Sequence, residues 1–69
     1  MRATTRNLRE GTPIVADDRS GKRSGTVESV FRDYNGKSWA MMVTFTNDET
    51  GKLDGAWLKD VTLKGGQNG

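Results

Sequence analysis

The 69-residue chain contains no cysteine, no histidine and only one proline. Without thiols it has neither a disulfide nor a thiolate zinc site to support its fold. Without histidine it lacks the one side chain whose unperturbed pKa lies near neutral pH, and the usual pairs of nucleophile and base are missing as well. We therefore expect a protein that is not an enzyme and that needs no metal and no cofactor.

Long apolar runs are missing too. Apolar residues make up 32% of the chain, and no run approaches the length of about 18 residues that indicates a membrane span. The polar N-terminus also lacks the apolar segment of a signal peptide. These absences predict a protein without membrane contact, in a reducing cytoplasm, whose single small core gives modest stability or favours homo-oligomers.

The strongest structural signal is Asn35-Gly36, which separates two runs rich in β-branched and aromatic residues. This dipeptide is typical of a two-residue type I′ turn between antiparallel strands. Counted outward from such a turn, Arg32 faces Trp39 and Val30 faces Met41. The sequence thus predicts a central β-hairpin with one apolar face.

An irregularity is expected in the first strand of this hairpin. Val27 and Val30 are both apolar, but they differ in parity and would point to opposite faces of an unbroken strand. One extra residue near Ser29, a β-bulge, brings both onto one face and opposes Val27 to Val43. The bulge also bends the strand, as a barrel of few strands requires. The predicted core consists of Val27, Val30, Met41, Val43 and Phe45.

The remaining chain divides at its glycine-rich and polar segments. We expect further strands at 13–16, 53–57 and 61–63, a long loop at 17–25, and a helical turn at 58–60. The resulting fold is all-β, a small five-stranded barrel with a short helical turn before the last strand. Residues 1–7 are expected to form a flexible basic arm, 8–64 the barrel and 65–69 a disordered tail.

Several short motifs resemble one family of small barrels. These are Gly11, Ile14-Val15, Gly25-Thr26-Val27, Val43-Thr44-Phe45 and residues 57–63. Together they resemble the SH3-like barrels, and residues 11–30 are most similar to the KOW-type motif of ribosomal and transcription-associated proteins. The resemblance implies the SH3-like fold and favours a nucleic-acid partner. The Ala-Leu-Tyr-Asp-Tyr segment of signalling SH3 domains is absent, so binding of proline-rich peptides is not expected.

Positive charge gathers in the first third of the chain. Residues 1–23 contain six lysines and arginines against three acidic residues, whereas the net charge of the whole chain is +2. A basic region of this kind suits phosphate backbones, although an ordinary solvated surface has the same appearance. Within the predicted loop, the candidates for phosphate contact are Arg19, Lys22 and Arg23.

Aromatic and basic side chains share one end of the predicted hairpin. By the expected register, Arg32, Tyr34, Lys37 and Trp39 lie on one face. Aromatic platforms flanked by cations bind the bases and phosphates of single-stranded nucleic acid. Alternatively, Trp39 caps one end of the barrel and Arg32 lies across it as a cation–π pair. The leading prediction is therefore a non-catalytic barrel that binds nucleic acid, with single strands favoured.

A protein partner is the alternative. Met42 and Phe31 are predicted on the face of the hairpin opposite the core, where an exposed apolar patch would mark a docking surface. Trp57 is adjacent to Leu58, and only one of the two can point inward from an extended chain. On this interpretation the protein is an interaction module or a small accessory subunit, which includes homo-oligomers, that docks through Phe31, Met42 and Trp57.

Overall fold

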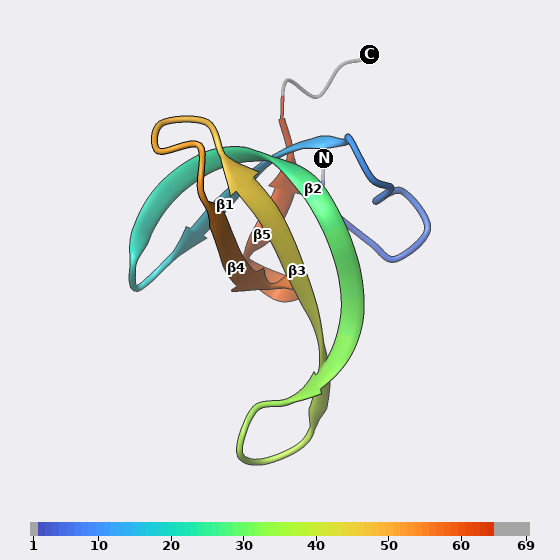
Figure 1. Cartoon of the computed structure of the whole chain (residues 1–69). Coiled ribbons are helices and arrows are strands. Elements are labelled where there is room, and N and C mark those ends of the chain that lie inside the picture. Colours follow the sequence, from blue (N-terminus) through green and yellow to red (C-terminus); the bar gives the residue numbers. More distant parts are fainter. Residues whose placement is uncertain (1, 65–69) are drawn as a thin grey trace.

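Five antiparallel strands form a single curved sheet in the computed structural model, which describes residues 2–64. Their order in the sheet is β4-β3-β2-β1-β5 (Figure 1). The elements are β1 (Pro13–Asp18), β2 (Gly21–Tyr34), β3 (Trp39–Asn47), β4 (Leu53–Trp57), the 3-10 helix η1 (Leu58–Asp60) and β5 (Val61–Leu63). The predicted all-β fold with one helical turn before the last strand is confirmed, and β4, η1 and β5 have the predicted bounds.

The 14-residue strand β2 pairs with two neighbouring strands. Its first half pairs with β1 and its second half with β3, and Gly25 and Thr26 have partners on both sides. Figure 1 shows β2 coiling around the molecule between them. Gly25 is required at this bend, because a Cβ there would overlap the ring of Phe45 and lie 2.5 Å from the carbonyl oxygen of Thr46.

The predicted bulge in β2 is confirmed. The register shifts between Val27 and Ser29, so that Glu28 is the extra residue. Val27 and Val30 consequently share the core face, as expected, but Val27 pairs with Phe45 and not with Val43. The observed partner of Val27 is thus two residues further along β3 than the predicted one, and this difference in register arises at the hairpin turn.

The two-residue turn predicted at Asn35-Gly36 is wrong. The last pair of the hairpin is Tyr34 with Trp39, so residues 35–38 form a four-residue loop. The Asn35 side chain is the cause, because its Oδ1 accepts hydrogen bonds from the backbone N–H groups of Lys37 and Ser38 in an Asx turn. A slip of two residues leaves the side chains of the two strands on their predicted faces, whereas Lys37 lies in the loop and not on a strand.

The long loop predicted at 17–25 is also wrong. Asp18 pairs with Gly21, and the connection between β1 and β2 is only the dipeptide Arg19-Ser20. Local polar contacts stabilise this tight turn, since Asp18 Oδ1 accepts a hydrogen bond from the Ser20 N–H and Gly21 adopts a positive φ of 105°. The polar residues of this segment therefore form an exposed β-hairpin and not an irregular loop.

The N-terminal segment lies against the sheet. Arg2 forms a bridge with Thr62, and the Ala3 N–H donates to the Val61 carbonyl at 3.3 Å. Ala3 and Leu8 are buried in the core. The segment predicted as a flexible basic arm therefore contacts β5 through its backbone and the core through the side chain of Ala3. The predicted tail at 65–69 lies outside the described residues.

The core is small and lies on the concave side of the sheet. Val27, Val43 and Phe45 are buried as predicted, whereas Val30 and Met41 are half-buried. The other buried apolar residues are Ala3, Leu8, Ile14, Ala16, Ala56 and Val61. Residues 2–64 contain no helix long and apolar enough to cross a membrane.

Two glycine substitutions test the role of the β2 bend. Gly25→Ala places a methyl group against Phe45 and the Thr46 backbone, so the free energy of unfolding should fall by about 2 to 3 kcal/mol. Gly55→Ala is the matched control, because its Cβ would meet nothing closer than 3.5 Å. Urea unfolding measures both, and equal stability of the two variants would contradict this account of the bend.

Candidate functional site

The hairpin of β2 and β3 extends beyond the rest of the sheet. β4 pairs with β3 only from Met42 to Thr46, so residues 39–41 have β2 as their sole partner within the described chain. Figure 1 shows the loop between β2 and β3 projecting away from the other strands. Side chains at this end have no opposing strand to cover them, and Trp39 is 64% exposed and Tyr34 53% exposed.

Three side chains form a cluster on the projecting hairpin, which we name the aromatic cluster: Arg32, Tyr34 and Trp39. The Tyr34 and Trp39 rings meet edge to face with their centroids 5.5 Å apart, and the Arg32 guanidinium lies 5.8 Å from the centre of the Trp39 ring. The expected cation–π pair is therefore present. Much of the Trp39 side chain is open to solvent, so this residue does not cap the core.

Two of the predicted basic residues line the same hollow. Arg19, from the turn between β1 and β2, and Lys37, from the hairpin loop, both line a depression of about 740 Å³ together with Trp57 and Lys59. Asp18 and Asp60 lie in the same wall. Among the described residues, none of the three basic side chains is in an ion pair. Lys22 is exposed near the start of β2.

Arg23 has a different environment from the other predicted phosphate ligands. Its side chain is only 14% exposed, and it forms ion pairs with Asp18 at 2.8 Å and Asp54 at 3.2 Å. Its guanidinium also lies over Phe45, and the Asn47 amide donates to Asp54. Two carboxylates neutralise Arg23, so its role is to join β1, β2 and β4 and not to attract an anion.

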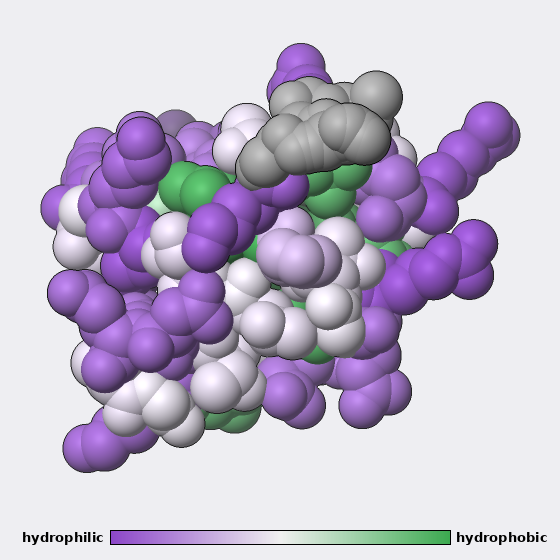
Figure 2. Space-filling view, turned by 90° about the horizontal axis from the view of Figure 1, so that it is seen from above, coloured by the Kyte–Doolittle hydropathy of each residue, from purple (hydrophilic) through white to green (hydrophobic). Residues whose placement is uncertain are grey.

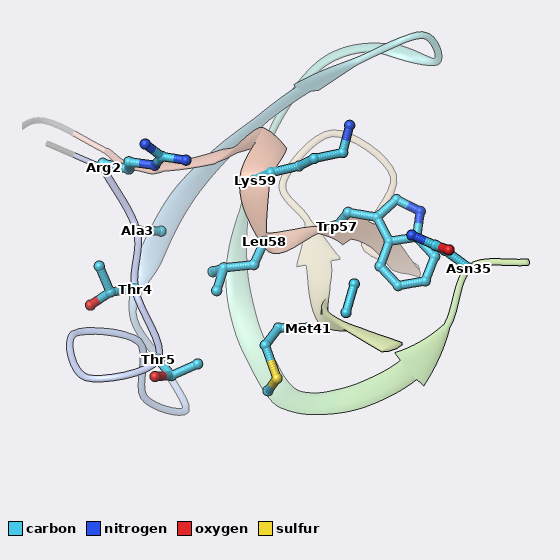
Figure 3. A pocket seen from close by; sticks show the side chains of 10 residues that line it. Arg2, Ala3, Thr4, Thr5, Asn35, Met41, Trp57, Leu58 and Lys59 are labelled. Atoms are coloured by element: carbon cyan, nitrogen blue, oxygen red, sulfur yellow. The ribbon is translucent and has the colours of Figure 1, made fainter. Parts of the chain in front are cut away.

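A second, smaller pocket adjoins the hairpin. Its volume is about 420 Å³, and Figure 3 shows Met41 and Leu58 pointing into it, with the Trp57 indole beside Asn35. Arg2 and Lys59 provide positive charge at its edge. Arg2 belongs to the basic N-terminal arm for which phosphate contact was predicted, whereas Lys59 was not predicted as a site residue, because only the folded chain brings η1 and the N-terminus to the hairpin.

The residues predicted for a protein interface are also brought together. Phe31 pairs with Met42, and Met42 pairs with Trp57, so the three form a row across neighbouring strands. Phe31 is 42% exposed, and Met42 and Trp57 are half-buried. Leu58, the neighbour of Trp57, packs against the core, as expected if only one of the two points inward.

The opposite end of the molecule has a different surface. Viewed from that end, it is mainly hydrophilic, and hydrophobic side chains appear only in small areas outside the grey residues (Figure 2). Within residues 2–64 no group of histidine, cysteine, aspartate or glutamate side chains could hold a metal ion. The hairpin end, with its exposed aromatic residues and two hollows, is therefore the best candidate for a binding site.

Comparisons with protein-family models, with curated proteins and with solved structures gave no match.

The structural role of Arg23 can be tested directly. Arg23→Ala removes two ion pairs and leaves the carboxylates of Asp18 and Asp54 without their cation, so the free energy of unfolding should fall by about 2 to 3 kcal/mol. Lys22→Ala, at an exposed neighbouring position, should unfold close to wild type in the same urea titration. A stable Arg23→Ala variant would return this residue to the candidate phosphate ligands.

Proposed function

We propose that this protein is a non-catalytic module that binds single-stranded nucleic acid with the end of the molecule that carries the projecting hairpin. The observation that carries the proposal is the aromatic cluster, in which an indole that is 64% exposed lies beside a tyrosine and beneath an arginine. Burial of such a ring against a base would remove apolar surface from water, and base stacking on aromatic side chains contributes about 1 to 3 kcal/mol per base.

Basic side chains around the cluster support a polyanionic ligand. Lys37 lies in the hairpin loop, and it lines the larger hollow together with Arg19. Each cation that neutralises a phosphate releases counterions, which favours association at low salt. The resemblance to KOW-type barrels favours the same class of partner.

The exposed rings favour a single strand over a duplex. In a duplex the faces of the bases are already stacked on one another, so Trp39 and Tyr34 would find only base edges or phosphates. A single strand offers free base faces to these two rings and phosphates to Arg19 and Lys37. Sequence preference is expected to be weak, because every base has a face that can stack.

Stacking and charge contribute separately to this binding and can be measured separately. Trp39→Ala should weaken binding to an oligothymidylate by about 1 to 3 kcal/mol with little change in salt dependence, because stacking releases no counterions. Arg19→Ala combined with Lys37→Ala should weaken binding and make the logarithmic salt slope shallower by about one to two units. Fluorescence anisotropy at several salt concentrations measures both quantities.

The control for the charge variants is Lys52→Ala. Lys52 is an exposed lysine in the turn between β3 and β4, at the opposite end of β3 from the hairpin loop (Figure 1), so its removal should change affinity little. If Trp39→Ala and the double variant both bind as wild type does, the hairpin end is not the nucleic-acid site.

A second candidate function rests on the row formed by Phe31, Met42 and Trp57. The register of three strands aligns these apolar side chains on the face of the sheet away from the core. Such a row fits a protein partner or a second copy of the chain. Phe31 and Met42 lie on the opposite face of the hairpin from the aromatic cluster, whereas Trp57 also lines the smaller pocket and the larger hollow, so the two functions would share this one residue.

The row can be tested by introducing a charge. Met42→Lys should keep the chain folded, because Met42 is half-buried on the outer face and a lysine can extend its ammonium into water. Any dimer found by sedimentation of the wild type should disappear in this variant. If Met42→Lys unfolds the protein, the side chain belongs to the core and the row is not a docking surface.

A further inference from the structure

We infer that the pocket of about 420 Å³ beside the hairpin receives one base of a bound single strand, with the adjoining phosphate held between Arg2 and Lys59. This inference rests on the proposed function and adds a second base site, a pocket, to the exposed aromatic cluster. The two sites contain different tryptophans, Trp57 in the pocket and Trp39 in the cluster.

The walls of the pocket suit a flat aromatic ring. Met41 and Leu58 point into the pocket, and the indole of Trp57 borders it on the hairpin side (Figure 3). Methionine and leucine side chains contact the faces of a ring, and an indole can stack on it. The volume lies at the lower end of the range for small-molecule sites, roughly 300 to 1,000 Å³, which is sufficient for one nucleotide.

The positive charge at the edge of the pocket favours a negatively charged ligand. Of the ten described residues that line it, Arg2 and Lys59 are basic and none is acidic. Among the described residues neither cation is in an ion pair, so both remain available to a ligand. An uncharged apolar side chain of a protein partner would leave these two cations without a role.

A fixed amide favours a base over a simple hydrocarbon anion. Asn35 lines the pocket, and its Oδ1 accepts hydrogen bonds from the backbone of Lys37 at 2.9 Å and Ser38 at 3.0 Å. These bonds hold the side chain in one orientation, and within residues 2–64 its Nδ2 has no hydrogen-bond partner. This N–H group can donate to the carbonyl oxygen of a thymine or uracil, which a fatty acid could not offer inside the pocket.

The pocket and the larger hollow are neighbours with a shared wall. Asn35, Trp57 and Lys59 line both of them. A strand whose base occupies the pocket would therefore pass Trp57 and bring its next phosphates toward Arg19 and Lys37. Basic side chains that have no ion pair among the described residues thus reach the two hollows beside Trp57 from four segments: the N-terminus, the turn between β1 and β2, the hairpin loop and η1.

Single-tryptophan variants separate the two base sites. Trp39→Phe leaves Trp57 as the only indole and keeps an aromatic ring in the cluster, and Trp57→Phe leaves Trp39. Each folded variant, checked by circular dichroism, is titrated with an oligothymidylate and with an abasic oligomer of equal length. We expect the oligothymidylate to quench Trp57 fluorescence and the abasic oligomer to quench it far less, since only the former supplies a base.

A charge variant links this signal to the pocket. In the Trp39→Phe background, Lys59→Ala should raise the Kd for quenching of Trp57 several-fold, whereas Lys52→Ala should leave it unchanged. Quenching of Trp39 without quenching of Trp57 would overturn the base pocket and leave the proposed function intact. Equal quenching of Trp57 by the abasic oligomer would also overturn it, and the absence of any binding would refute the proposed function itself.

Discussion

The contact of Phe45 with the bare backbone of Gly25 is the constraint on which the rest of the structure depends. Because residue 25 has no Cβ, the Phe45 ring occupies the space against β2 at the point where that strand has partners on both sides. The close approach lets one strand bend from β1 to β3 and enclose a core of few side chains. A 69-residue chain without disulfides depends on such packing.

The same strand explains why the candidate site lies where it does. β2 continues to Tyr34, well past the end of β4 at Trp57, so its last residues and those of β3 project without a covering strand. Tyr34 and Trp39 at this position pack against each other and, for Trp39, against Arg32, and not into the core. Their exposure is consistent with a role in binding, and the cations contributed by the neighbouring turns make a polyanion the most suitable ligand.

Local patterns predicted much of the fold, and contacts between distant residues account for what they missed. Alternation and parity predicted the strands of the central hairpin and a bulge near Ser29, which the structure places at Glu28. The predicted register of the hairpin was two residues off, because the Asn35 side chain closes a four-residue loop and not the two-residue turn that the dipeptide indicates. The polar β1–β2 hairpin resembled a loop because Arg23 meets Asp54 only in the folded chain. For the same reason Lys59 could not be assigned to a pocket, although the aromatic residues of the hairpin were identified correctly as neighbours.

The central claim is that bases, and not only phosphates, bind at the hairpin end. The most direct measurement compares the affinity of the wild-type protein for an oligothymidylate and for an inorganic polyphosphate with the same number of charges, at the same salt concentration. Stacking on exposed aromatic rings predicts clearly tighter binding of the oligothymidylate. Equal affinities would show a surface that binds polyanions by charge alone and would contradict the account.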